Sequence, residues 1–257
     1  MSLNPVTPLP ATVPDPTPDP ALRGPRLQTA FRGRVLVTGG GSGLGAAVTA
    51  AVTAAGGSVV VLDRDVSSVT EAKALQVDVA DRASVEVAVR EAALMLGGLD
   101  AVVTAAGIDR CGRLEDVAAA EWEKVISVNL LGTVSVIRAA LPYLTVSHGR
   151  VVTVASSLGI KAVADATAYC ASKFGVIGFS RALAAETRGQ VGVTTMIPAG
   201  MKTRFFDDRT EQYRPQDDSR LNDPENVAAA ILFVLGQPQG SEVREMVICH
   251  EEEESWP

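Results

Sequence analysis

The stretch Arg34-Val-Leu-Val-Thr38, followed by Gly39-Gly-Gly-Ser-Gly-Leu-Gly45, decides the fold of this chain. Its first five residues are mostly aliphatic, which favours a buried strand, and the glycines permit a tight turn. An Ala-rich helical pattern over residues 45–55 comes next. A strand that enters a helix through such a turn predicts a phosphate site at the helix N-terminus. A glycine-rich stretch alone is weak support for a phosphate site, and the alternative is a flexible turn without a ligand.

Short apolar runs and longer helical stretches alternate along the rest of the chain. Nearly continuous apolar runs are typical of strands that are buried on both faces of a sheet. The expected strands are residues 34–38, 58–63, 74–79, 101–104, 149–156, 191–197 and 242–248. The clearest expected helices are residues 45–55, 83–96, 118–144 and 167–186. This alternation predicts an α/β fold: a Rossmann-like, doubly wound parallel sheet of about seven strands in three layers.

The N-terminal residues differ in composition from the rest. Eight of the fourteen prolines lie in the first 25 residues, where their spacing prevents a helix. We expect a disordered tail over residues 1–30, with a polyproline ligand for a partner as the alternative. No linker-like segment divides residues 31–257, so we expect a single domain there.

Composition restricts the functional classes. Thirty Asp and Glu against 23 Lys and Arg give a net charge of −7, which repels a phosphate backbone, so we expect no nucleic-acid partner. No uninterrupted apolar run reaches the roughly 18 residues of a membrane helix, and the first twenty residues do not resemble a signal peptide. We therefore expect a cytoplasmic protein without a membrane partner. Three dispersed cysteines and two histidines predict neither a disulfide framework nor a metal site.

Two carboxylates follow expected strands. Asp63 ends the second strand about 24 residues beyond Gly39, near the offset at which an acidic residue accepts the ribose hydroxyls of a dinucleotide. An Asp there repels the 2′-phosphate of NADP and favours NAD, although Arg64 offsets part of the repulsion and an ordinary strand-end Asp is the alternative. Asp78 either lies beside the adenine or caps a turn.

Four polar residues suggest acid–base chemistry. Tyr169 and Lys173 are four residues apart in an expected helix, which places the phenol and the ammonium on one face. A nearby cation lowers the tyrosine pKa from about 10 toward the working range. The alternative is that Tyr169 and Lys173 are an ordinary pair on a helix surface without a catalytic role. Ser156 ends a buried strand and could bind a substrate oxygen. Asn129 lies among apolar residues, which suggests a structural or water-holding role.

Taken together, residues 31–203 resemble the short-chain dehydrogenase/reductase family. Thr38 to Gly45 is similar to its Thr-Gly-x-x-x-Gly-x-Gly cofactor turn. Its catalytic tetrad falls on Asn129, Ser156, Tyr169 and Lys173. The resemblance implies hydride transfer between a nicotinamide cofactor and an alcohol or ketone, in a homodimer or homotetramer. It implies that Tyr169 moves the proton, Lys173 binds the nicotinamide ribose, Ser156 positions the substrate oxygen and Asn129 holds a water.

The expected cofactor contacts combine the glycine turn, the strand ends and the tetrad. They are Gly39, Ser42, Gly43, Leu44, Gly45, Asp63, Arg64, Asp78, Val79, Ala105, Ala106, Gly107, Tyr169, Lys173, Pro198 and Thr203. Thr104-Ala-Ala-Gly107 replaces the family's Asn-Asn-Ala-Gly, and Pro198-Ala-Gly200 replaces its Pro-Gly. The usual Gly-Gly ending of the family is missing as well. The alternative functions are an NADPH-dependent 3-oxoacyl or sugar-ketone reductase, and a non-catalytic regulator that senses dinucleotides.

Residues 201–223 mix aromatic and charged side chains after the sixth strand. Their position predicts a lid over the substrate, and the alternative is a solvated surface helix. Cys170 is expected to be a small buried apolar residue rather than a redox group. Glu251 to Glu254 is expected to be a frayed, solvated terminus, with Trp256 as an alternative anchor on a neighbouring subunit.

Overall fold

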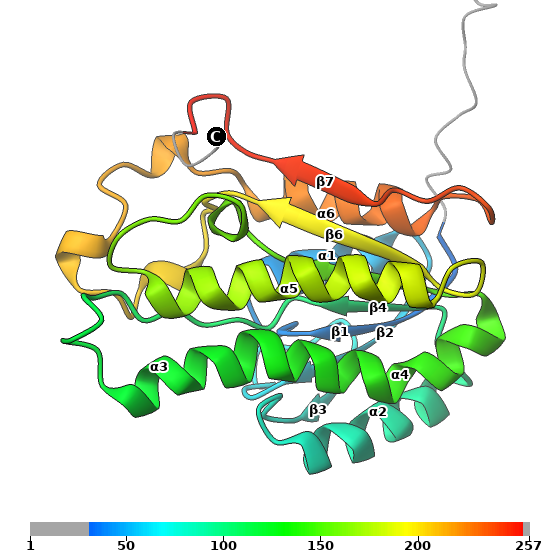
Figure 1. The fold of residues 1–257 in the computed structure, drawn as a ribbon. Helices are drawn as coiled ribbons and strands as arrows, with labels where there is room; N and C mark the ends of the chain where they lie inside the picture. Colours follow the sequence, from blue (N-terminus) through cyan, green and yellow to red (C-terminus); the bar gives the residue numbers. More distant parts are fainter. Residues whose placement is uncertain (1–30, 254–257) are drawn as a thin grey trace, which may run out of the picture.

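The computed structural model describes residues 31–253, so the tail expected at residues 1–30 and the alternative of an anchor at Trp256 lie outside the described residues. Seven parallel strands form one sheet in the order β3-β2-β1-β4-β5-β6-β7 (Figure 1). They are β1 (Arg34–Thr38), β2 (Ser58–Asp63), β3 (Lys73–Gln76), β4 (Ala101–Thr104), β5 (Arg150–Val154), β6 (Gly192–Pro198) and β7 (Glu245–Ile248). The doubly wound parallel sheet is therefore confirmed.

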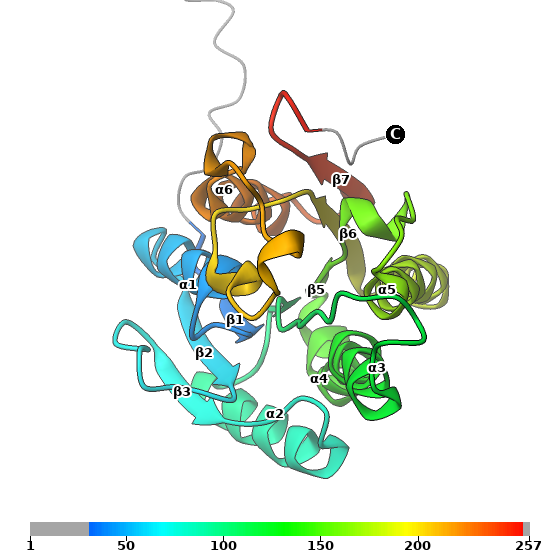
Figure 2. The ribbon, with the colours of Figure 1, turned by 90° about the vertical axis from the view of Figure 1, so that its left-hand side faces the viewer.

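Helices cover both faces of the sheet and make three layers. They are α1 (Gly43–Ala54), α2 (Arg82–Leu96), α3 (Ala119–Ile126), α4 (Thr133–Ser147), α5 (Thr167–Glu186) and α6 (Pro224–Leu235). Helices α1 and α6 pack together on one face, and α2, α4 and α5 lie on the other (Figure 2). Both faces of the central strands are thus buried, which explains their nearly continuous apolar sequences.

Several boundaries differ from the expected ones. The third strand is expected to end at Val79 but ends at Gln76, and the seventh begins at Glu245 rather than Glu242. The expected helices do not include α6, although Pro224 stands at its start, a position that proline favours. The single helix expected over residues 118–144 is α3 and α4, joined by a π-helical turn, η2 (Ser127–Gly132).

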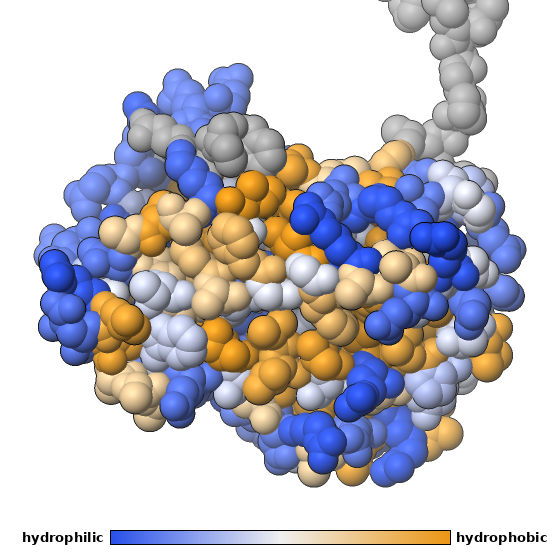
Figure 3. All heavy atoms as spheres, in the orientation of Figure 1, coloured by the Kyte–Doolittle hydropathy of each residue, from blue (hydrophilic) through white to orange (hydrophobic). Residues whose placement is uncertain are grey.

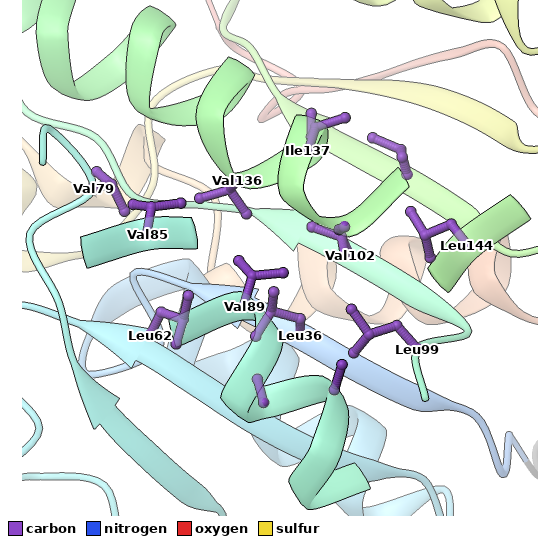
Figure 4. Close-up of a cluster of buried hydrophobic side chains, with 14 of the residues drawn as sticks. Leu36, Leu62, Val79, Val85, Val89, Leu99, Val102, Val136, Ile137 and Leu144 are labelled. Atoms are coloured by element: carbon purple, nitrogen blue, oxygen red, sulfur yellow. The ribbon is translucent and has the colours of Figure 1, made fainter. Parts of the chain in front are cut away.

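The core is divided between the two faces of the sheet. Alternate side chains of β1 point to opposite faces, so Leu36 joins one cluster and its neighbours Val35 and Val37 join the other. Figure 4 shows the first cluster, in which Leu36 lies among side chains from α2 and α4. Burial of these aliphatic side chains is the main stabilisation of the layered structure.

The topology determines where a ligand can bind. The chain turns from β1 toward β2 on one side, and β4 returns on the other side of β1. In the register of the sheet, Thr38 pairs with both Leu62 and Thr104. The segments that leave these three strands therefore separate at one edge, where open α/β sheets bind their ligands.

One continuous helical run, Ala119–Ser147, is long and apolar enough to cross a membrane, judged by length and composition alone. In this fold Val136, Ile137 and Leu144 of that run pack into the core against the sheet. A core helix is apolar for this reason, so the run carries no argument for a membrane span.

Candidate active site

A cavity of about 750 Å³ opens at the carboxyl ends of the strands. Its wall contains every expected cofactor contact, together with Ser156. Asn129 is not part of the wall, because it is buried behind it. The volume is typical of a site for small molecules. The structure therefore brings residues from distant parts of the chain to a single cavity.

The glycine turn is shaped by close backbone contacts. Gly39 has a φ of +72°, and a Cβ added there would lie 2.7 Å from the Ala106 backbone nitrogen. A Cβ on Gly45 would lie only 2.1 Å from the carbonyl oxygen of Gly39. Helix α1 begins at Gly43, and the Ser42 side chain does not cap its first N–H groups. These free donors and the helix dipole fit the pyrophosphate of a dinucleotide.

The Asp63 carboxylate faces this turn. It accepts hydrogen bonds from the Gly41 N–H at 2.8 Å and the Asp65 N–H at 3.0 Å. A carboxylate has about four acceptor positions, so capacity remains for ribose hydroxyls. Asp78 lines the cavity and also accepts a hydrogen bond from the Ala80 N–H at 2.9 Å. It therefore forms part of the wall and stabilises a turn at the same time.

Tyr169 and Lys173 lie in the first two turns of α5, and both are buried. The Lys173 ammonium donates to the Val154 carbonyl at 2.9 Å and lies 5.5 Å from the centroid of the Tyr169 ring. The Ser156 and Tyr169 side chains are hydrogen-bonded. The hydroxyl, the phenol and the ammonium thus converge on one region of the cavity.

Burial controls the protonation of this group. It raises the pKa of Tyr169 well above its ordinary value, and the hydrogen bond from Ser156 only partly opposes it. Burial also lowers the pKa of Lys173 to about 8. The sequence argument that a neighbouring ammonium lowers the tyrosine pKa is therefore not met here, because desolvation is the larger effect. Near neutral pH the pair is a phenol beside an ammonium.

The depressed pKa of Lys173 predicts how stability depends on pH. Between pH 8 and 10.5 the unfolded chain binds a proton that the folded chain does not, so stability rises with pH. We compare the free energies of unfolding of the wild type and of Lys173→Met. Their difference should shift by about 2 kcal/mol in favour of the wild type when the pH is raised from 7 to 9.5. Urea denaturation of both proteins at the two pH values measures this difference. An unchanged difference would show that Lys173 titrates normally.

Asn129 lies in the π-helical turn and holds the segment that follows β4. Its side-chain oxygen accepts from the Ile108 N–H at 2.8 Å, and its amide donates to the Ile108 carbonyl at 2.9 Å and to the Ser172 hydroxyl at 3.0 Å. These contacts fix the backbone beside Gly107, where an added Cβ would lie 3.7 Å from the Lys173 ammonium. Asn129 is thus placed to position this segment, and its water-holding role remains a prediction.

The segment expected to form a lid lines the same cavity. Its residues form three short 3-10 turns rather than a surface helix: η4 (Arg204–Phe206), η5 (Glu211–Tyr213) and η6 (Asp218–Arg220). The Phe205 ring lies 5.6 Å from the Tyr169 ring, centroid to centroid. This position over the phenol supports the lid interpretation, although movement remains a prediction.

Asp109 and Glu253 are two of the cavity residues that the sequence analysis does not assign to the site. Asp109 lies two residues beyond Gly107 in no recognisable motif, and its carboxylate contacts Arg209 of the lid segment at 2.6 Å. Glu253 was expected in a frayed terminus, but it lines the cavity and accepts a hydrogen bond from the Gly200 N–H at 3.4 Å. Neither could be found from local patterns, because both depend on how distant segments meet.

The cysteines add no reactive centre to this description. Cys170 is buried, in agreement with its expected packing role. Burial and the neighbouring Asp109 carboxylate raise the pKa of the Cys111 thiol to about 12, which keeps it protonated. Within residues 31–253, no group of three or more His, Cys, Asp or Glu side chains is placed to hold a metal ion.

Comparison with known proteins gives consistent matches. The family described as short chain dehydrogenase matches residues 33–214. An uncharacterized oxidoreductase of Staphylococcus aureus strain MW2 is 31% identical over 224 residues, which cover 83% of this chain and 95% of the relative. D-threitol dehydrogenase of Mycolicibacterium smegmatis is 33% identical over 221 residues, which cover 77% and 84%.

A solved structure has the same fold. It is an alcohol dehydrogenase from the archaeon Thermococcus sibiricus, complexed with 5-hydroxy-NADP. The TM-score is 0.77 at 22% identity, and the match covers 85% of this chain and 97% of that one. At this identity the likeness concerns the fold alone.

Proposed function

The chain belongs to the short-chain dehydrogenase family, and from that premise we propose that it transfers a hydride between NAD and an alcohol or ketone, with Tyr169 as the acid and base. The observation that carries this proposal is the convergence of Ser156, Tyr169 and Lys173 in the cavity that the glycine turn also lines. Membership of the family supports an oxidoreductase activity. The three side chains support the more specific proposal that Tyr169 exchanges a proton with an alcohol or ketone.

The residues divide the chemistry among themselves. A bound nicotinamide supplies or accepts the hydride at the substrate carbon. The Ser156 hydroxyl holds the substrate oxygen beside the phenol, and Tyr169 donates a proton to that oxygen in reduction or removes one in oxidation. Lys173, whose ammonium lies 5.5 Å from the centroid of the Tyr169 ring, would hold the nicotinamide ribose. The N–H groups at the start of α1, which the Ser42 side chain does not cap, would hold the pyrophosphate.

A turnover assay with NAD and NADP tests the proposal. Secondary alcohols and the matching ketones are supplied in turn, and the absorbance of the reduced cofactor is followed. We expect turnover on at least one alcohol–ketone pair. Cofactor binding without any turnover would instead support the alternative of a dinucleotide-sensing regulator.

The substrate class has more than one candidate. A relative at 33% identity is named for D-threitol, which makes polyols candidates beside simple alcohols. The sequence alternative, a 3-oxoacyl or sugar-ketone reductase, uses the same tyrosine chemistry with NADPH. The panel should therefore include polyols, sugar ketones and a 3-oxoacyl thioester.

The Asp63 carboxylate is the basis for NAD rather than NADP. A 2′-phosphate would bring a second negative charge beside a carboxylate that the Gly41 N–H already orients. We expect NAD to bind roughly ten- to a hundredfold more tightly than NADP, or about 1–3 kcal/mol, and Asp63→Ser to narrow this gap. Calorimetric Kd values for both cofactors measure it.

Asp65→Ala is the matched control for that experiment. Asp65 carries the same charge two residues away, but it does not line the cavity. If Asp65→Ala reduces the ratio of the Kd values for NADP and NAD as much as Asp63→Ser does, the preference for NAD comes from the overall negative charge of this region and not from the Asp63 carboxylate itself. Equal Kd values for the two cofactors in the wild type would overturn the NAD assignment.

We also propose that the enzyme is a homodimer or homotetramer. Figure 3 shows apolar side chains gathered on the face formed by α3, α4 and α5. On this face Leu131 is 54% exposed and Phe174 is 45% exposed, which suits an interface between copies. We expect light scattering to give a dimer or tetramer and Phe174→Glu to shift it toward monomer. Leu94→Glu, an exposed position on α2, should leave the mass unchanged, and a monomeric wild type would contradict the proposal.

The proposed activity fixes the expected partners and location. A small alcohol or carbonyl compound and the cofactor occupy the cavity, and we propose no nucleic-acid or membrane partner. The net charge of −7 supports the first of these expectations. A cytoplasmic location, where both the cofactor and small alcohols are available, remains part of the proposal.

A further inference from the structure

A buried ion pair lies in the cavity that contains Tyr169. The Arg209 Nη2 donates to the Asp109 Oδ2 at 2.6 Å, and the two side chains are only 16% and 2% exposed. Both residues line the cavity. The desolvation of two buried charges offsets much of their mutual attraction, so stability alone is a weak explanation for such a pair. The proposed hydride transfer assigns no role to either residue.

Both members of the pair are held in place relative to the phenol. Asp109 follows Ile108, whose N–H and carbonyl are both bound by the Asn129 side chain. The Arg209 guanidinium lies 4.6 Å from the centroid of the Phe206 ring and 5.7 Å from that of Phe205. Phe205 in turn contacts the Tyr169 ring. The ion pair is therefore attached to the reacting region from both the body and the lid segment.

The pair keeps unused hydrogen-bonding capacity. The Asp109 carboxylate also accepts from the Arg110 N–H at 2.7 Å and the Cys111 thiol at 3.2 Å, so three of its roughly four acceptor positions are used. Among the residues that the structure describes, the buried Arg209 Nε has no hydrogen-bond partner. A buried N–H donor without a partner is unusual, and a ligand oxygen could reach this one after a shift of the Arg209 side chain.

A hydroxyl group satisfies both members of such a pair. It accepts one hydrogen bond from a guanidinium N–H and donates one to a carboxylate oxygen. An anionic substrate does not fit as well, because it would compete with Asp109 for Arg209 and leave a buried carboxylate unpaired. A purely aliphatic alcohol would leave the Arg209 Nε without a partner. The chemistry therefore favours an uncharged substrate with a second hydroxyl.

Resting on the function proposed above, we propose that Asp109 and Arg209 recognise a hydroxyl beside the reacting carbon, so that the substrate is an uncharged vicinal diol or polyol. In its oxidation the C–H bond breaks and the hydride goes to the nicotinamide, while the O–H proton goes to Tyr169. The product is the α-hydroxyketone. Because Arg209 belongs to the lid segment and Asp109 to the body, the bound hydroxyl also joins these two parts.

The test compares butane-2,3-diol with butan-2-ol, which differ by one hydroxyl on the same carbon chain. In the wild type we expect kcat/KM for the diol to exceed that for butan-2-ol at least tenfold. The double variant Asp109→Asn with Arg209→Met removes both charges and so leaves neither one unpaired. It should reduce kcat/KM at least tenfold for the diol and less than threefold for butan-2-ol, with an unchanged Kd for NADH.

The control is a second double variant, Arg181→Met with Glu245→Gln. It removes an ion pair of 2.6 Å between α5 and β7 that lies outside the cavity. It should keep the wild-type preference for the diol. Equal kcat/KM values for the two alcohols in the wild type, or equal losses for both in the Asp109 and Arg209 variant, would overturn the inference while the proposed dehydrogenase function stands.

Ligand-observed NMR with NADH present separates this inference from the function on which it rests. If neither alcohol nor any other member of the substrate panel is turned over, the proposed function fails, and binding of butane-2,3-diol and erythritol then decides the recognition role. Binding of a diol that the double variant abolishes supports it. If neither butane-2,3-diol nor erythritol binds, or if they bind equally well to the double variant, the recognition role is overturned. If the variant does not fold, the wild-type ratio of kcat/KM for the two alcohols decides alone.

Discussion

Tyr169→Phe should lower turnover by roughly 10²- to 10⁴-fold while the Kd for NADH stays within a few fold. The phenyl ring keeps the packing of Tyr169 against Phe205, whose ring centroid is 5.6 Å away. Only the hydroxyl is lost, and with it the proton that the substrate oxygen gains or loses. Steady-state kinetics on the best alcohol of the panel, together with fluorescence titration of NADH, measures both quantities.

The pH dependence gives this prediction a second readout. Because burial raises the pKa of Tyr169, the phenol is protonated near neutral pH and is ready to act as an acid. Ketone reduction should therefore be sustained near pH 7, and alcohol oxidation, which needs the phenolate, should rise as the pH increases. Tyr143→Phe on α4 lies outside the cavity and should behave as the wild type. Wild-type turnover by Tyr169→Phe would remove this residue from the chemistry.

The parts of the fold that sequence predicts best are those with local patterns. The strand Arg34–Thr38, its glycine turn and the helix that follows form one contiguous segment. The structure has the strand as expected and begins the helix two residues earlier than expected, at Gly43. Tyr169 and Lys173 belong to one helix, so their spacing alone places them on one face. Ser156 and Asp63 follow strands, and parallel strands bring their carboxyl ends to one edge of the sheet.

Features that depend on distant contacts were not predictable in the same way. Asp109 and Arg209 are 100 residues apart, and no periodic pattern relates them. The π-helical turn around Asn129 lies in a continuous apolar helical stretch, where a change of helix type leaves the pattern nearly intact. The effect of Lys173 on the tyrosine pKa was expected from charge alone. The Tyr169 pKa is raised instead of lowered because the phenol is buried, which only the packed structure reveals.

The glycine turn offers the second large effect, through Gly45→Ala. The added Cβ would lie 2.1 Å from the oxygen and 2.5 Å from the carbon of the Gly39 carbonyl, and both are backbone atoms. The turn therefore has to open, which moves the N–H groups at the start of α1 away from the pyrophosphate. We expect the Kd for NAD to rise at least a hundredfold, or about 2.7 kcal/mol, with turnover falling in parallel.

Gly178→Ala on α5 is the matched control, because nothing lies within 4 Å of its added Cβ. In a helix interior this change should stabilise the protein by about 0.5–1 kcal/mol and leave the Kd for NAD unchanged. Calorimetry gives the Kd values, and thermal melts separate lost binding from lost folding. If Gly45→Ala keeps a native melt and loses NAD, the turn itself binds the pyrophosphate. If it binds NAD as tightly as the wild type, the dinucleotide does not rest on this turn, and the cofactor contacts assigned along the cavity must be placed elsewhere.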